Sequence, residues 1–230
     1  MIDLSTIKPN SQKALFLAKK QLSELVFNTV NLEGINYTLP EVQTLLDGVT
    51  VGGHKQVDEL ITLNQIQSWR FLFEKVENNE FDLSFGFVCK LQREVAKKEA
   101  LTWGKFREGG VSIAGTDYLP PKAKELPKLW ERLTQKSIPN DIDYIYRYAI
   151  SWFLQMARIQ FFYDGNKRTG RLIMNGILLT KGLPVINLPA KRQLEFNQLM
   201  LDFYPSNNEE PMQIFMLSCL GNKFLKIMSE

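Results

Sequence analysis

Histidine and cysteine are both scarce in this chain of 230 residues, which has one histidine and two cysteines. Cys89 and Cys219 are too few for the disulfide framework of a small secreted protein, and they match neither a zinc site nor a Cys-x-x-Cys pair. No uncharged apolar run approaches the roughly 20 residues that cross a bilayer. Residues 1–13 also lack the basic and then apolar pattern of a secretory signal. We therefore expect a cytoplasmic protein with no membrane segment.

Net charge is also small, because 28 Lys and Arg residues face 25 Asp and Glu residues, which leaves +3. This excess is too low for bulk charge to indicate nucleic-acid binding. Hydrophobic residues make up 44% of the chain and charged residues 23%, as in ordinary globular proteins. The length and composition predict a single domain over residues 1–230.

Helical periodicity dominates the hydrophobic pattern, so the sequence predicts an all-α bundle. Residues 103–121 break this pattern, because they contain four glycines, a short alternation through Val111, Ser112 and Ile113, and a final Pro-Pro pair. Such a segment is typical of one small β-hairpin, although a plain connector is the alternative. The predicted helices cover about 11–28, 39–47, 57–76, 83–100, 140–161, 167–181, 191–203 and 210–227.

Asp164 to Arg171 is the segment with the clearest chemistry. Gly165 and Asn166 tolerate positive φ, and the helix that follows offers the N–H groups of its first turn to an anion. Arg168 and Arg171 are three residues apart, so both can face one polyphosphate. Asp164 adds a hard oxygen ligand for a phosphate-bound Mg²⁺. The alternative is an ordinary helix N-terminus with solvated arginines, and no Walker A pattern is present.

Residues 160–171 resemble the signature of the Fic (Fido) family, which is His-Pro-Phe-x-Asp/Glu-Gly-Asn-Gly/Lys-Arg-x-x-Arg. The match includes Phe162 and all specified positions from Asp164 to Arg171, and it fails at Gln160 and Phe161. Residues 103–121 resemble the family's flap, since they begin with Gly-Lys-Phe-Arg and end in Pro-Pro. Residues 29–34 are similar to the Ser/Thr-x-x-x-Glu-Gly/Asn motif of the family's inhibitory helix.

The resemblance implies a Fic-type helical bundle with one small β-hairpin flap, which transfers AMP from ATP to a hydroxyl group of a target protein. The inhibitory helix would lie in residues 1–50, the flap in 103–121, and the signature helices and loop in 140–181. A protein partner of unknown identity is implied, and a homo-oligomer is left open.

The resemblance also assigns roles to individual residues. Glu33 would inhibit by pairing with Arg171, which would otherwise bind the γ-phosphate. Phe162 would anchor the loop in the core. The remaining roles are Mg²⁺ binding by Asp164, phosphate binding by Gly165, Asn166, Lys167, Arg168 and Gly170, and docking of a target strand by Val111, Ser112 and Ile113.

Gln160 stands where the family has its catalytic histidine. A neutral amide cannot accept a proton near neutral pH, so Gln160 cannot be a general base. His54 is too far away in sequence to be expected in its place. Three explanations remain open: chemistry that has been lost or changed, slow transfer through another base, or an engineered residue. Phe161 favours natural divergence, because disabling the base would not require a change at its neighbour.

The leading hypothesis is therefore an autoinhibited AMP-transferase whose catalytic site is impaired. The alternative is a catalytically silent Fic-fold regulator that binds a nucleotide or a protein. A third hypothesis, nucleic-acid binding, is disfavoured by the low net charge and by the carboxylate beside the arginines. Its basic patch would consist of Arg158, Lys167, Arg168 and Arg171.

Overall fold

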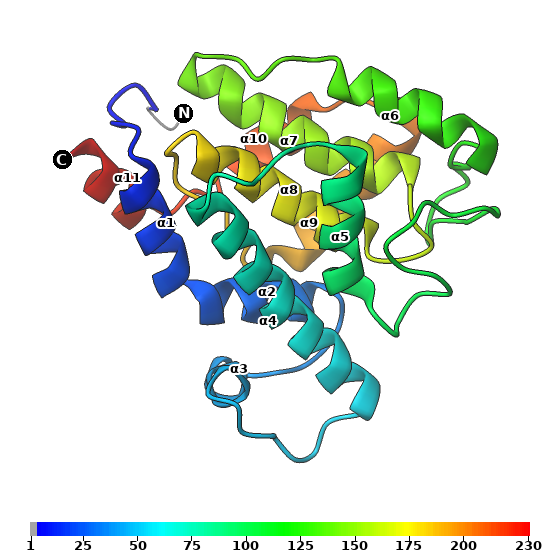
Figure 1. Ribbon diagram of the computed structural model, residues 1–230, viewed down its shortest axis with the longest axis horizontal. Helices are drawn as coiled ribbons and strands as arrows, with labels where there is room; N and C mark the ends of the chain where they lie inside the picture. The colour runs from blue at the N-terminus through cyan, green and yellow to red at the C-terminus, as the bar shows by residue number, and fades with distance from the viewer. Residues whose placement is uncertain (1–3) are drawn as a thin grey trace.

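The computed structural model describes residues 4–230 and shows an all-helical protein (Figure 1). The helices α7 (Ile142–Ile159) and α8 (Asn166–Thr180) form an antiparallel pair joined by a six-residue loop. Every residue of α8 from Arg168 to Leu179 is buried, so this helix forms the axis of the bundle. Its neighbours are α1 (Ser11–Lys20), α4 (Gln56–Glu77) and α5 (Phe85–Ala96).

The remaining helices surround this centre. α2 (Leu22–Leu32) packs on α4 and on α3 (Leu39–Leu46). α11 (Asn222–Ser229) lies beside α1, so the first and last helices are neighbours (Figure 1). Three more helices are α6 (Leu126–Thr134), α9 (Gln193–Ser206) and α10 (Glu210–Leu217). Short 3₁₀ turns, η1 (Ala123–Glu125) and η2 (Ala190–Arg192), precede α6 and α9.

Most of the helices expected from the sequence are present, with some different boundaries. The predicted helix 11–28 is two helices separated at Gln21, and the predicted helix 210–227 is likewise divided into α10 and α11. α5 ends earlier than expected because Lys98 turns the chain with a φ of 65°. The capping box between Thr38 and Glu41 is present at the start of α3. The sequence analysis missed α6, whose proline at the start and short length weakened its helical pattern.

The predicted β-hairpin is wrong, since residues 103–121 form an irregular loop and no strand occurs in residues 4–230. No backbone hydrogen bond joins the two arms of this loop; instead the Arg107 N–H donates to the Phe161 carbonyl at 3.0 Å. This contact with the loop after α7 takes the place of the cross-strand ladder that the alternation through Val111, Ser112 and Ile113 led us to expect. Within the same described residues, no helix is long and apolar enough to cross a membrane.

Candidate functional site

The loop between α7 and α8 is organised by the side chain of Asn166. Its Oδ1 accepts a hydrogen bond from the Phe162 N–H at 2.9 Å, while its Nδ2 donates to the Phe162 carbonyl at 2.7 Å and to Gln160 Oε1 at 2.9 Å. Gln160 ends α7 in the left-handed conformation, with a φ of 55°. Asn166, the first residue of α8, therefore binds the loop at its first residue, Gln160, and at Phe162.

Gly165 allows the loop to pass close to α5 where it enters α8. Its φ is +74°, and a Cβ atom there would lie 3.0 Å from Val95 Cγ1 and 3.2 Å from Ala96 Cβ. Both the backbone conformation and the space therefore require glycine. Because Gly165 has no side chain with which to cap α8, the N–H groups of the helix's first turn are left for another acceptor. This arrangement suits an anion such as a phosphate.

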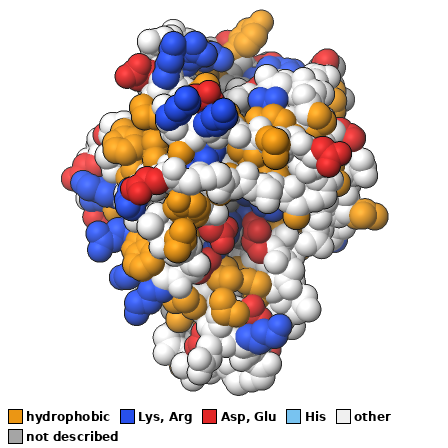
Figure 2. Space-filling model, turned by 90° about the vertical axis from the view of Figure 1, so that its right-hand side faces the viewer, with side chains coloured by type: hydrophobic (Ala, Val, Ile, Leu, Met, Phe, Trp, Pro, Cys, Tyr) orange, Lys and Arg blue, Asp and Glu red, His pale blue; other side chains and the backbone are white. Residues whose placement is uncertain are grey.

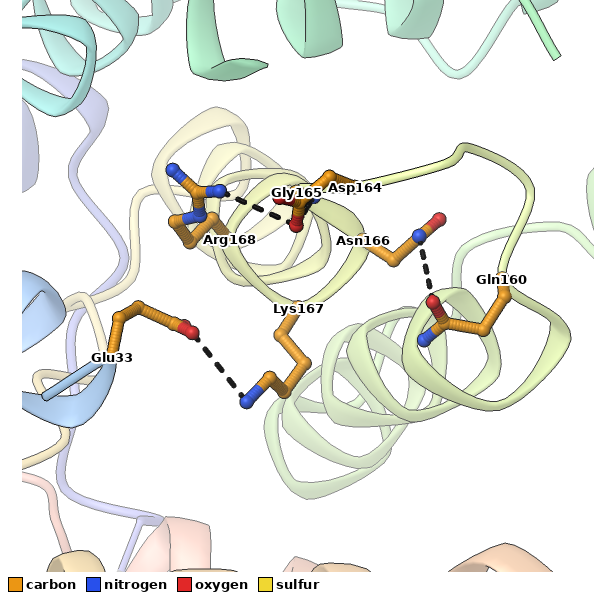
Figure 3. Close-up of a pocket in the computed structure, with 7 residues that line it drawn as sticks. All are labelled: Glu33, Gln160, Asp164, Gly165, Asn166, Lys167 and Arg168. Carbon is orange, nitrogen blue, oxygen red and sulfur yellow. Dashed lines mark hydrogen bonds and ion pairs between the residues drawn. The ribbon is translucent and has the colours of Figure 1, made fainter. Parts of the chain in front are cut away.

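A small cavity of about 60 Å³ lies at this helix start (Figure 3). Pockets that enclose small-molecule ligands usually measure about 300–1,000 Å³, so a whole nucleotide does not fit in the cavity as it stands. Glu33 reaches it from α2, on the side facing Lys167 (Figure 3). The cavity brings together most of the predicted site residues, because it is lined by Glu33, Gln160, Asp164, Gly165, Asn166, Lys167 and Arg168.

Glu33 is bound by two cations of α8. Its Oε1 accepts a hydrogen bond from Arg171 Nη2 at 2.9 Å, and its Oε2 lies 3.6 Å from Lys167 Nζ. Burial alone would raise the pKa of Glu33, but the charges of Lys167, Arg171 and Arg168 outweigh it and hold the pKa below its ordinary value. Glu33 is therefore ionised at neutral pH, and it occupies the side of the site on which Arg171 lies.

Arg171 is nearly buried, with 7% of its side chain exposed. Its Nε and Nη1 have no hydrogen-bond partner among the described residues, and burial lowers its pKa despite the nearby Glu33 carboxylate. Only one of its three nitrogens is therefore satisfied. An incomplete set of bonds on a buried guanidinium is costly, and it leaves Arg171 with capacity for another acceptor.

Arg168, which was expected to bind phosphate, is paired with two carboxylates of the chain. Its Nη1 donates to Glu99 Oε2 at 2.7 Å, and its Nη2 lies 3.5 Å from Asp164 Oδ1. Sequence analysis missed Glu99, because a glutamate among lysines after a helix is usually solvated. Nothing in the local pattern distinguishes it.

The C-terminal half of α5 supports the back of the signature loop. Gln92 is completely buried, where its Nε2 donates to the Asp164 carbonyl at 3.1 Å and its Oε1 accepts from the Gly104 N–H at 2.6 Å. It therefore connects the signature loop to the start of the 103–121 loop. The sequence analysis did not select Gln92 either, since its place in the helix predicts only a core position.

Arg107 fastens the 103–121 loop to the end of α7. It is 2% exposed, and its guanidinium donates to the carbonyls of Gln160, Gly109 and Pro121. No carboxylate is paired with it among the described residues. Its bond to Gln160 satisfies a carbonyl group that the end of α7 leaves without a partner, and its other two bonds join carbonyls of its own loop.

Several predicted residues lie outside the cavity. Gly170 faces α7, where an added Cβ would be 3.1 Å from the Phe153 carbonyl oxygen, so its small size serves helix packing. Val111, Ser112 and Ile113 lie in the irregular loop. His54 stacks on Tyr37 at 3.7 Å and contacts Glu41, far from Gln160 in the chain.

Phe161 and Phe162 are both completely buried, which agrees with a core role for Phe162. Phe161 packs on Phe106 and Trp130, with ring centroids 4.9 Å and 5.2 Å away. The aromatic residue in place of the family's proline therefore contributes to the core beneath the 103–121 loop.

Metal binding was predicted for Asp164. No group of three or more His, Cys, Asp or Glu residues suited to a metal ion occurs in residues 4–230. Asp164 does fit a metal that phosphates also hold, because its side chain is 59% exposed and Mg²⁺ commonly uses one or two carboxylates together with substrate phosphates.

Comparison with known proteins identifies related sequences and folds. Residues 82–178 match the model of the Fic/DOC family. Protein adenylyltransferases named Fic from Drosophila melanogaster and Drosophila sechellia are each 25% identical over 193 residues, which is 81% of this chain and 38% of theirs. The chain thus spans less than half the length of these relatives.

Solved structures share the fold. A Fic domain containing signaling protein from Bacteroides thetaiotaomicron superposes with a TM-score of 0.77 at 20% identity, covering 98% of this chain and 91% of that one. Fic-1 from C. elegans gives a TM-score of 0.74 at 16% identity and covers 95% of this chain and 72% of its own. The match over residues 82–178 places that segment in the Fic/DOC family, and the solved structures show that the fold extends over nearly the whole chain.

Proposed function

We propose that this chain binds Mg·ATP at the start of α8 and is a nucleotidyltransferase of the protein-adenylylating type, held in an inactive state by Glu33. The observation that carries the proposal is the contact of Glu33 with Arg171 and Lys167 beside an uncapped helix N-terminus. Because Glu33 already pairs with the cations of this anion site, its carboxylate must move away before the phosphates of ATP can bind them. The names of the Drosophila relatives support the same type of reaction.

The phosphates would lie against the first turn of α8. The N–H groups of that turn and Lys167 would bind the phosphate oxygens, and Arg171, once free of Glu33, would reach the outermost phosphate. Mg²⁺, held by Asp164, would offset the phosphate charge. Catalysis of this kind depends mainly on positioning and on charge stabilisation, which these groups can supply.

The reaction would transfer AMP to a hydroxyl group of a target protein. The hydroxyl oxygen forms a bond to the α-phosphorus, the bond to the β-phosphate oxygen breaks, pyrophosphate leaves, and the hydroxyl proton must be removed. Gln160 cannot remove it, because a neutral amide is not a base near neutral pH. Its Oε1 also accepts from Asn166, and its Nε2 donates to the Ala157 carbonyl at 2.6 Å. Since general base catalysis typically contributes about 10²- to 10⁴-fold, we expect slow transfer.

A catalytically silent regulator is the second candidate, and the bonding of Gln160 favours it. Its amide joins the end of α7 to the start of α8, which stabilises the loop through contacts within the chain. Such a protein would act by binding, with a protein partner. The face shown in Figure 2 carries Lys and Arg side chains interspersed with Asp and Glu, which disfavours nucleic acid. Both cysteines are free and buried, which supports a place in the cytoplasm.

The first experiment measures binding of Mg·ATP by calorimetry to the chain and to Arg171→Ala. We expect weaker binding in the variant, and unchanged binding in Arg132→Ala, which removes an exposed arginine of α6. Equal affinity in Arg171→Ala would place the nucleotide elsewhere. Incubation with labelled ATP and a lysate then separates the two candidates, because only a transferase labels protein.

A further inference from the structure

The ion pair of Arg168 with Glu99 is the most deeply buried pair of opposite charges near the site. The two side chains are 5% and 4% exposed, and Arg168 Nη1 lies 2.7 Å from Glu99 Oε2. Burying two charges is repaid only when their geometry is good and the remaining polar atoms are bonded. The second oxygen, Glu99 Oε1, meets this condition because it accepts from Asn64 Nδ2 at 2.6 Å.

Backbone conformation fixes the place of Glu99. The chain leaves α5 through Lys98, whose φ is 65°, and Asn64 Nδ2 also donates to the Lys97 carbonyl at 2.9 Å. Asn64 on α4 therefore holds both this turn and the carboxylate that follows it. Glu99 is a rigid anion and cannot follow a ligand into the site.

The other end of Arg168 faces Asp164. Asp164 Oδ1 accepts from the Gly165 N–H at 2.6 Å and lies 3.5 Å from Arg168 Nη2 (Figure 3). None of the described residues donates to Asp164 Oδ2, and the side chain is 59% exposed. Arg168 and the Gly165 N–H therefore hold one oxygen, and the other is left for a ligand from outside.

Glu99 changes the net charge of the site. Lys167, Arg168 and Arg171 bring three positive charges, and Glu33, Glu99 and Asp164 bring three negative charges, so the site is neutral. Without Glu99 the site would carry one extra positive charge, located on the guanidinium that already faces Asp164.

We propose that Glu99 is a positioning residue that holds Arg168 and neutralises it, so that Asp164 keeps its negative charge available to a divalent cation. The inference rests on the proposed Mg·ATP site, and it gives Glu99 the role of setting how strongly ATP binding depends on Mg²⁺. Arg168 and the cation compete for Asp164. Because Glu99 pairs with Arg168 at 2.7 Å and neutralises its charge, Arg168 binds Asp164 less strongly. Arg168 thus orients Asp164 and contributes less to direct phosphate binding.

Glu99→Gln tests this, because glutamine keeps the shape and removes the charge. The extra positive charge disfavours the cation and favours the anion, so metal-free ATP should bind more tightly and Mg²⁺ should help less. The measured quantity is the ratio of the Kd for ATP in EDTA to the Kd in Mg²⁺, obtained by calorimetry. We expect this ratio to fall about tenfold in Glu99→Gln, the effect of one neighbouring charge.

Two further variants separate this role from a structural one. Glu99→Asp keeps the charge and should retain most of the ratio, while Glu131→Gln, which removes an exposed glutamate of α6, should leave it unchanged. Damage to the fold alone would weaken ATP binding in both conditions and leave the ratio as it was. An unchanged ratio in Glu99→Gln overturns the proposal.

A second measurement does not depend on nucleotide. Titration of the nucleotide-free protein with Mn²⁺ should broaden the NMR signal of the Gly165 N–H, which lies beside Asp164, and Glu99→Gln should require several-fold more Mn²⁺. Equal titration curves would refute the role of Glu99. Failure of the wild-type chain to bind Mg·ATP would refute the proposed function separately, because the Mn²⁺ result stands without it.

Discussion

Glu33 and Arg171 lie 138 positions apart in the sequence, and Arg171 Nη2 donates to Glu33 Oε1 at 2.9 Å. The contact joins the end of α2 to the second turn of α8, and 22% and 7% of the two side chains are exposed. A charge-assisted hydrogen bond between groups shielded in this way contributes about 1.5–3 kcal/mol. Such a contact is strong enough to keep Arg171 paired with Glu33 and weak enough to be broken by a competing ligand.

Glu33→Gly should therefore tighten ATP binding. Removing the carboxylate frees Arg171 and Lys167 for phosphate, and a gain approaching tenfold corresponds to ~1.4 kcal/mol. Calorimetric titration with Mg·ATP measures it without requiring any turnover. Asp47→Gly is a matched control, because Asp47 also ends a helix just before a glycine with positive φ and lies exposed at the end of α3.

The double change Glu33→Gly with Arg171→Ala tests whether the two residues act together. If they form one coupled pair, removing Glu33 should bring little gain once Arg171 is absent. An equal gain with and without Arg171 would mean that Glu33 acts through Lys167 or through its bulk.

The pH dependence of the proposed inhibition follows from the lowered pKa of Glu33. A carboxylate whose pKa falls on folding contributes stability that is present above its unfolded pKa and is lost as the pH falls through the folded pKa. Glu33 therefore stays charged from pH 5.5 to 8. We expect the gain in ATP affinity from Glu33→Gly to be the same across that range. A gain that shrinks between pH 8 and pH 5.5 would show that Glu33 takes up a proton there.

Much of this site could be predicted from sequence because its parts are short and local. Gly165 and Asn166 indicated a loop that turns into a helix N-terminus, and the loop has that form. The contact of Glu33 with Arg171 came from a resemblance, since no local rule joins residues so distant in sequence. The cavity also brings Gln160 beside Asn166, which periodicity alone does not predict.

Other parts depend on tertiary contacts that leave no local signal. Glu99 is one glutamate among exposed lysines until Asn64 and Arg168 surround it. The glycines of residues 103–121 suggested a hairpin, but Arg107 donates to the carbonyls of Gln160 and Phe161, just after α7, and no ladder forms. Turn-forming residues show that the chain can bend, and the packing partners decide where its hydrogen bonds go.

Gly170→Ala should destabilise the fold by about 1–3 kcal/mol. Its added Cβ would lie 3.1 Å from Met156 Cβ and 3.1 Å from the Phe153 carbonyl oxygen, so α7 and α8 would have to move apart. Urea unfolding measures the change. Gly86→Ala is the control, because nothing lies within 4 Å of an added Cβ at that position of α5, and it should be neutral or slightly stabilising.

Gln160→His should raise AMP transfer by restoring a base at the end of α7. Histidine tolerates the left-handed conformation that residue 160 adopts better than most side chains do. With a pKa near 6.5 it can accept a proton at neutral pH. The change belongs in the Glu33→Gly background, so that inhibition does not mask the gain. Incorporation of label from ATP should rise at least about tenfold, within the range that general base catalysis typically supplies.

Gln160→Asn in the same background controls for the loss of the amide contacts with Asn166 and Ala157, because it remains neutral and should stay inactive. If the histidine variant binds Mg·ATP as tightly as its parent and still transfers no label, then the base is not the only missing part. Phe161 would then be the next position to change, since its ring packs on Phe106 and Trp130 where the family has proline. Activity that appears only in Gln160→His with Phe161→Pro would show that the two neighbours diverged together.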